Sequence, residues 1–206
     1  MLQITTEKPA GFSFVPGQAT ELSIDKEGWR EEKRPFTFTS LPQDEVLEFT
    51  IKTYPSHQGV TNELLELKAG ESLLLHDVFG AIAYKGEGVF IAGGAGVTPF
   101  ISIFRDLKAR GEVGSNRLIF ANQTRGDIIL EKEFRSLLIG NFINILSKET
   151  SRVYPRGYIT KDFLKDHLPE TRPFIYLCGP PPMMEAVTQQ LEELNFDKER
   201  LVIEEF

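Results

Sequence analysis

Two short glycine-containing segments carry the residues with the clearest chemical potential. Residues 93–99 read Gly-Gly-Ala-Gly-Val-Thr-Pro, and residues 178–183 read Cys-Gly-Pro-Pro-Pro-Met. Each follows an apolar run typical of a buried strand and precedes a run with helical spacing. Residues without side chains let the phosphates of a ligand approach the backbone, and the free N–H groups of a helix start attract anions. The first segment predicts a phosphate-binding turn, with Thr98 as N-cap and Pro99 as first helical residue. The pair indicates a dinucleotide site.

Residues 34–40, Arg-Pro-Phe-Thr-Phe-Thr-Ser, form a second chemical constellation. On a regular strand, Arg34 and Phe36 share one face and Thr37 lies on the other. A guanidinium suits a phosphate, and a ring beside a hydroxyl suits a planar heterocycle. Residues 59–62, Gly-Val-Thr-Asn, open a predicted helix and offer a second anion site.

Each motif also has a purely structural interpretation when it is taken alone. A tight strand-to-helix turn needs glycine whether or not a ligand binds, and Cys178 can be a small buried residue at a strand end. Residues 34–40 can be an ordinary half-buried strand, and residues 59–62 a plain helix start. The order of the two glycine segments along the chain favours the interpretation as a ligand site.

Composition narrows the possible functions of this chain of 206 residues. A net charge of −7 without a block of Lys and Arg argues against nucleic acid or an anionic membrane as the main partner. One cysteine excludes an internal disulfide and a four-thiolate iron–sulfur cluster, and the histidines show no ligand spacing with it, so we expect no protein-bound metal. No apolar stretch is long enough to span a membrane, and the start shows no leader, which makes the cytoplasm the default expectation.

The first part of the chain has the pattern of short strands separated by turns. This pattern predicts a small antiparallel barrel or sandwich, with one helix at residues 62–67. The expected strands are residues 12–15, 19–24, 34–40, 46–52, 72–76 and 81–84. The polar residues 85–88 mark a change of pattern. We therefore place one domain at residues 1–85 and a second at residues 86–206.

The second domain alternates strands with helices, which predicts a doubly wound parallel sheet. Its first and fourth strands are neighbours when the strand order is 3-2-1-4-5. The two glycine segments follow these strands, so we expect both turns to face one crevice. The expected strands are 89–92, 117–121, 142–146, 173–178 and 201–205, and the expected helices are 99–109, 129–138, 160–167 and 181–194.

These motifs, in this order, resemble those of the ferredoxin-NADP reductase family of flavoproteins, within it the compact flavodoxin/ferredoxin reductase-like members without an iron–sulfur domain. The resemblance spans nearly the whole chain and rests on residues 16–18, 34–40, 59–62, 79–80, 93–99, 178–182 and 204–206. It implies a Greek-key β-barrel that binds FAD, followed by a domain that binds a nicotinamide nucleotide.

The resemblance also implies roles for individual residues. Phe36 replaces the usual tyrosine of the family, and Thr37 takes the serine position near flavin N5. Residues implied to bind FAD are Arg34, Phe36, Thr37, Gly59, Val60, Thr61 and Phe206. Residues implied to bind NAD(P) are Gly94, Gly96, Thr98, Arg125, Cys178 and Gly179. The implied catalytic residues are Thr37, Cys178 and Glu204. The alternative is that residues 201–206 are only the fifth strand of the sheet with a frayed end, and that Arg125 is a plain surface charge.

The implied activity is hydride transfer from NAD(P)H to FAD, followed by electron transfer to a separate flavodoxin, ferredoxin or partner subunit. Two alternatives are a non-catalytic nucleotide-binding or electron-transfer subunit and a flavin or ferric reductase. Arg125 and Thr124 give a slight preference for NADPH, which Asp127 weakens. Family members usually have a further barrel strand before residues 14–18. We expect none in this chain, so the barrel is predicted to be open at that edge or covered by another chain.

Overall fold

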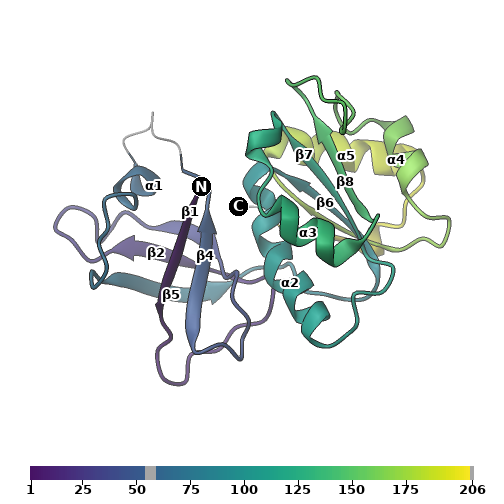
Figure 1. Cartoon of the computed structure of the whole chain (residues 1–206). Coiled ribbons are helices and arrows are strands. Elements are labelled where there is room, and N and C mark those ends of the chain that lie inside the picture. Colours follow the sequence, from purple (N-terminus) through teal and green to yellow (C-terminus); the bar gives the residue numbers. More distant parts are fainter. Residues whose placement is uncertain (54–58, 205–206) are drawn as a thin grey trace.

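A computed structural model describes residues 1–53 and 59–204, which form two domains side by side (Figure 1). Two small antiparallel sheets build the N-terminal domain, one of β1 and β4 and one in the order β3-β2-β5, and an isolated bridge between Phe38 and Phe49 connects them. Buried residues from both sheets, among them Leu22, Phe38 and Phe49, form its core. The elements are β1 (Leu2–Glu7), β2 (Ala19–Ile24), β3 (Arg34–Thr37), β4 (Val46–Ile51), α1 (Val60–Glu63) and β5 (Leu73–Phe79).

Several sequence-based expectations for this domain need correction. Residues 12–15 and 81–84 are not strands, and the helix is Val60–Glu63 rather than 62–67. Strand β1 was not expected, yet Leu2–Glu7 pairs antiparallel with β4 along its full length. The expectation of a missing strand near the start is therefore wrong. The alternation of half-buried Leu2 and Ile4 with exposed Gln3 and Thr5 fits a strand with one face on the core.

The C-terminal domain confirms the predicted doubly wound sheet. Its strands are parallel and lie in the order β10-β9-β6-β7-β8, which is the expected order 3-2-1-4-5 read from the opposite edge. The strands are β6 (Gly88–Gly93), β7 (Arg117–Asn122), β8 (Phe142–Leu146), β9 (Phe174–Cys178) and β10 (Leu201–Ile203). The helices are α2 (Thr98–Ala109), α3 (Glu131–Leu138), α4 (Lys161–His167) and α5 (Pro181–Glu193).

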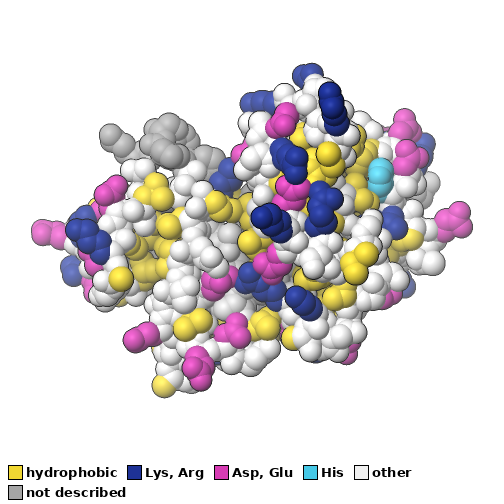
Figure 2. Space-filling model, in the orientation of Figure 1, with side chains coloured by type: hydrophobic (Ala, Val, Ile, Leu, Met, Phe, Trp, Pro, Cys, Tyr) yellow, Lys and Arg dark blue, Asp and Glu magenta, His cyan; other side chains and the backbone are white. Residues whose placement is uncertain are grey.

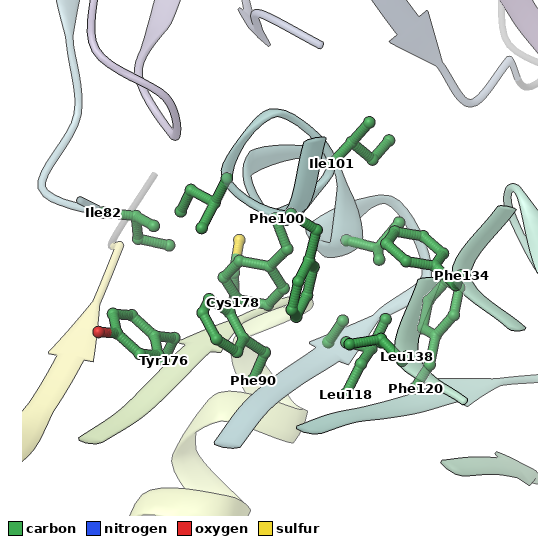
Figure 3. Close-up of a cluster of buried hydrophobic side chains, with 14 of the residues drawn as sticks. Ile82, Phe90, Phe100, Ile101, Leu118, Phe120, Phe134, Leu138, Tyr176 and Cys178 are labelled. Carbon is green, nitrogen blue, oxygen red and sulfur yellow. The ribbon is translucent and has the colours of Figure 1, made fainter. Parts of the chain in front are cut away.

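Apolar helix faces cover both sides of this sheet. Helices α2 and α3 pack on one face through a cluster that includes Phe90, Phe100, Phe134 and Tyr176 (Figure 3). Helices α4 and α5 pack on the other face around Leu164, Val187 and Leu191. Strands buried on both sides read as continuous apolar runs, which explains why the sequence located them well.

Polar contacts join the two domains. The backbone N–H of Gly17 donates to the Ser102 hydroxyl at 3.0 Å, and both residues lie deep in the interface. Arg105 of α2 donates to the carbonyl oxygen of Thr39 at 2.7 Å and to Glu48 Oε1 at 2.5 Å, while its Nε donates to Glu133 at 2.7 Å. Figure 2 shows Lys and Arg side chains interspersed with Asp and Glu over α2 and α3, the face where this ion-pair network lies.

None of the helices in the described part of the chain is long and apolar enough to cross a membrane. The cytoplasmic location and the domain boundary at residues 85–86 stay predictions.

Replacing Arg105 by alanine is expected to lower the free energy of unfolding by roughly 1–3 kcal/mol, because Glu48 and Glu133 lose the partner that offsets their desolvation. Burial alone would raise the pKa of the Glu48 carboxyl, but Arg105 lowers it overall. The contribution of the Glu48 carboxylate to the free energy of unfolding is therefore complete above its ordinary pKa of about 4.3. This contribution is lost as pH falls through the lowered pKa of the folded protein. Urea unfolding at pH 7 and pH 3 measures this, and the Arg105→Ala effect should shrink at pH 3.

A matched control is Arg110→Ala, which removes a more exposed arginine from the end of the same helix. It should change stability by less than about 1 kcal/mol. Equal losses for both variants would contradict a special role for Arg105 at the domain interface.

Candidate active site in the cleft between the domains

A cleft of about 1140 Å³ lies where the two domains meet. The N-terminal domain contributes Phe36 and Thr37 from β3 and Lys52 from the segment after β4. The C-terminal domain contributes both glycine turns, at residues 93–96 and 178–179. Segments far apart in the sequence therefore line one cavity, as the predicted strand order requires.

The first glycine turn leaves β6 as a short 3-10 helix, Gly94–Val97, that runs directly into α2. Gly94 has a φ of +53°, a left-handed conformation that favours glycine. Thr98 is the first residue of α2 rather than its N-cap, which is Val97, and this corrects the expected positions of Thr98 and Pro99. The Thr98 hydroxyl donates to the carbonyl oxygen of Ala95 at 3.0 Å and lies 3.2 Å from the Thr37 hydroxyl of the other domain.

The second turn packs directly against the first. Strands β6 and β9 pair in register, with Ala92 opposite Cys178, so both turns begin at the same level of the sheet. A Cβ on Gly96 would overlap the carbonyl group of Cys178, and a Cβ on Gly93 would overlap the thioether of Met183. Gly96 is thus required by contact with the backbone of Cys178 and Gly179, whatever the cleft binds, whereas Gly93 makes room for the side chains of Met183 and Pro180.

Gly96→Ala is expected to lower the free energy of unfolding by about 1–3 kcal/mol, because the new methyl group forces the two turns apart. Gly126→Ala is the control, since a Cβ there meets only the Thr124 hydroxyl at an ordinary 3.8 Å. Urea denaturation of both variants measures the difference. Unchanged stability of Gly96→Ala would show that the contact between the turns relaxes freely.

Cys178 ends β9 beneath the cleft, 1% exposed, and lies among the aromatic residues of the core (Figure 3). Burial, together with the negative charge of Glu204, raises the pKa of its thiol to about 12. The thiol is therefore neutral near pH 7 and is a poor nucleophile. Such a group can pack against a ligand or donate a weak hydrogen bond.

Alkylation of Cys178 by iodoacetamide at pH 8 should be at least about a hundredfold slower in the folded protein than in guanidinium chloride, because only the thiolate reacts. Labelling is followed by mass spectrometry. The chain has one cysteine, so a Cys178→Ala variant supplies the unlabelled baseline. Fast alkylation of the folded chain would mean that the thiol is exposed or ionised.

Glu204 is 6% exposed and follows β10. Its Oε2 accepts hydrogen bonds from the backbone N–H groups of Ala81 at 2.8 Å and Ile82 at 3.0 Å. The carboxylate thus holds residues 81–82, in the linker (residues 81–84) that leads into the second domain. Its charge also raises the pKa of the Cys178 thiol. It is not among the residues that line the cleft.

The structure brings only part of the expected site together. Phe36, Thr37, Gly94, Gly96, Thr98, Cys178 and Gly179 all line the cleft. Arg34 does not: its guanidinium lies at the surface and bonds Glu32 and the carbonyl oxygen of Lys33. Gly59, Val60 and Thr61 lie at the start of α1, also outside the cleft lining. Arg125 pairs with Glu131 at 3.4 Å. Phe206 lies outside the described residues.

Other residues line the cleft that the sequence did not single out. Lys52 Nζ lies 3.2 Å from Asp127 Oδ1, so this ion pair crosses from one domain to the other. Tyr158 is 73% exposed at the cleft edge, which is unusual for an aromatic ring. The buried amide of Asn122 has no hydrogen-bond partner among the described residues. No local sequence motif marks these side chains as cleft residues. The only local signal is an aromatic residue directly after a glycine, Gly157-Tyr158.

An antiparallel β-domain beside a doubly wound sheet, with two glycine turns opening onto the cleft between them, defines the two-domain fold of the ferredoxin-NADP reductase-like flavoproteins. Residues 90–189 match the family described as "Oxidoreductase NAD-binding domain". The flavohem-like FAD/NAD binding domain of nitric oxide dioxygenase from Vibrio cholerae O1 biovar El Tor superposes with a TM-score of 0.84 at 22% identity, covering 99% of this chain and 91% of that one. Ferredoxin NADP+ reductase from Neisseria gonorrhoeae, solved with FAD and NADP bound, gives 0.81 at 18% identity, covering 98% and 90%.

Residues 90–189 thus match an oxidoreductase NAD-binding domain, and the whole chain has the two-domain fold that its sequence motifs predicted. The reductase component of propane 2-monooxygenase from Rhodococcus jostii (strain RHA1) is 31% identical over 224 residues, which cover 100% of this chain and 59% of that protein. NADH-cytochrome b5 reductase 2 from Rattus norvegicus is 29% identical over 178 residues, covering 72% of this chain and 64% of that protein. The chain thus spans less than two thirds of the length of these curated relatives.

Proposed function

We propose that the chain binds FAD and a nicotinamide nucleotide in the cleft between its domains and passes electrons from NAD(P)H to a separate acceptor. The observation that carries this proposal is the convergence of Phe36 and Thr37 with both glycine turns on one cavity, where the Thr37 and Thr98 hydroxyls lie 3.2 Å apart. Two ring systems that exchange a hydride must meet in such a place, held by groups from both domains.

The cleft residues fit a flavin on the side of the N-terminal domain. Phe36 offers an aromatic face, and the Thr37 hydroxyl offers a hydrogen bond at the edge of the same strand. Arg34, exposed at the start of β3, is proposed to leave Glu32 and bind the FAD pyrophosphate together with Gly59, Val60 and Thr61. Phe206 is proposed to cover the flavin ring, as the family resemblance implies.

The C-terminal side of the cleft fits a nicotinamide dinucleotide. Gly94 and Gly96 open a turn onto the start of α2, where free backbone N–H groups favour a pyrophosphate, and Lys52 adds a positive charge beside it. Tyr158 offers an exposed ring for the adenine. Cys178 and Gly179 lie under the position proposed for the nicotinamide ring.

The bound flavin would supply the redox chemistry, since it accepts two electrons as a hydride and releases them singly. The chain's own residues would orient the two rings and exclude water from between them. Gly96 and Gly179 allow the two turns to pack closely beside the proposed ring site, and the neutral Cys178 thiol adds no negative charge to that surface. Glu204 acts through the linker and through its charge on Cys178, which makes it a positioning residue in this proposal.

Charges near the proposed adenosine site favour NADH, against the slight NADPH preference expected from the sequence. Arg125 pairs with Glu131, its backbone N–H donates to Glu149, and Thr124 donates to Asp127. Each group that was expected to hold a 2′-phosphate is already bound to a carboxylate. A phosphate placed there would meet like charge, which disfavours NADPH.

A protein acceptor is proposed because the curated relatives are named as the reductase component of a monooxygenase and as a reductase of cytochrome b5. The described part of the chain contains one cysteine, so this part cannot itself hold a cluster on four cysteine thiolates.

Anaerobic titration of FAD-loaded protein with NADH and, separately, NADPH tests the proposal through the visible absorption of the flavin. We expect NADH to bleach the flavin at a rate at least about tenfold above that with NADPH. Bound flavin that neither nucleotide reduces would favour a non-catalytic nucleotide-binding subunit. Failure to bind FAD at all would overturn the roles given to Phe36 and Thr37.

A further inference from the structure

One ion pair spans the proposed dinucleotide site. Lys52 comes from the N-terminal domain and Asp127 from the loop after β7 in the C-terminal domain, and Nζ lies 3.2 Å from Oδ1. Both side chains are about three-quarters buried, with 25% and 27% exposed, and both residues line the cleft. A Cβ on Gly94 would lie 4.0 Å from Lys52 Nζ, so the ammonium group lies directly beside the first glycine turn.

The two partners differ in their freedom to move. Asp127 Oδ2 accepts from the backbone N–H of Thr124 at 3.0 Å and from its hydroxyl at 2.8 Å, which closes a capping box over residues 124–127. The aspartate is thereby fixed on its own loop. Lys52 has a long flexible side chain, so breaking the pair means that the lysine moves and the aspartate stays.

We propose that Asp127 is an internal competitor of the nucleotide: it holds Lys52 across the cleft, and the pyrophosphate of the dinucleotide must draw the lysine away to bind. This inference rests on the proposed function, because it takes the first glycine turn as the pyrophosphate site. An ammonium ion beside that turn is a point charge within reach of the Asp127 carboxylate and, in the proposed complex, of the pyrophosphate of the ligand.

The strength of the pair suits an exchange of partners. Burial alone would raise the pKa of Asp127, but its hydrogen bonds with Thr124 and Lys52 lower it, so the carboxylate is charged at neutral pH. Partly exposed ion pairs contribute only modestly to stability. A pyrophosphate carries more negative charge than Asp127 and also accepts hydrogen bonds from the backbone of the turn, so it can displace Asp127 from Lys52. The apparent dissociation constant then equals the intrinsic one divided by the fraction of molecules in which Asp127 does not hold Lys52.

Removing the competitor should therefore tighten binding. Asp127→Asn keeps an oxygen that can accept from Thr124 but loses the charge that holds Lys52, and we expect it to bind NAD+ about fivefold more tightly than the unchanged chain. Lys52→Met should weaken binding. The decisive comparison is Asp127→Asn in the Lys52→Met background, where we expect almost no further change, because no lysine remains to be released.

Isothermal titration calorimetry of the four FAD-loaded proteins with NAD+ makes this comparison, with Thr124→Ala as a control for loss of the capping box alone. Equal tightening by Asp127→Asn with and without Lys52 would overturn the proposal, since it would show simple removal of a repulsive charge. Tightening by Thr124→Ala equal to that by Asp127→Asn would also overturn it. If Asp127→Asn fails to fold, Asp127→Ser, which retains a capping oxygen, takes its place.

The outcome also separates this inference from the proposed function. A folded, FAD-loaded protein that binds no NAD+ at millimolar concentration would overturn the dinucleotide site itself, and the competition with it. Binding of NAD+ without a Lys52-dependent effect of Asp127→Asn would overturn the competition alone.

Discussion

The contact between the two glycine turns is the constraint on which the arrangement of the cleft depends. Strands β6 and β9 pair in register, so their chains leave the sheet at the same level and must separate within a few residues. Gly96 lies against the backbone of Cys178 and Gly179, and Met183 fills the space above Gly93 and Gly179. Side chains at these positions would push the strand ends apart. The floor of the cleft is therefore made of backbone.

The cleft walls depend on how the two domains are held together. Arg105, Ser102 and Glu204 of the C-terminal domain bind backbone or carboxylate groups of the other domain or of the linker. Arg105, Ser102 and Glu204 do not line the cleft, whereas Lys52 and Asp127 do and meet across it. The domains are thus joined by contacts outside the cleft and by one ion pair in its lining. For the proposed function, the outer contacts would keep the two domains at a fixed spacing while the inner pair exchanges partners.

The sequence predicted the elements of the C-terminal domain and the location of the glycine turns, because both follow from local rules. A fully buried strand is an apolar run, and a turn pressed against another backbone needs glycine. The strands of the N-terminal domain were predicted less accurately from the sequence. Residues 12–15 contain three apolar side chains, and Phe14 stacks on Phe38, but the segment pairs with no strand in the described chain. Residues 81–84 contain the linker, whose N–H groups at Ala81 and Ile82 bind Glu204 in place of a strand.

The side chains that cross between domains could not be predicted from the sequence. Lys52 and Asp127 are 75 positions apart, and Arg105 and Glu48 are 57 apart, so their contact depends on how two separately folded units dock. No spacing rule connects such residues. Arg34 is a different case: its motif was recognised, but its guanidinium lies at the surface and bonds Glu32, only two positions away.

The hydrogen bonds between Glu204 and the linker have a consequence for folding during synthesis on the ribosome. The N–H groups of Ala81 and Ile82 bond a carboxylate that lies 123 and 122 positions further along the chain. At the usual pace of a ribosome, the N-terminal domain is complete many seconds before that partner emerges. During this interval the two N–H groups lack their carboxylate partner. The contact between Glu204 and the linker therefore forms later in synthesis than those of Ser102 and Arg105, once β10 docks at the edge of the sheet.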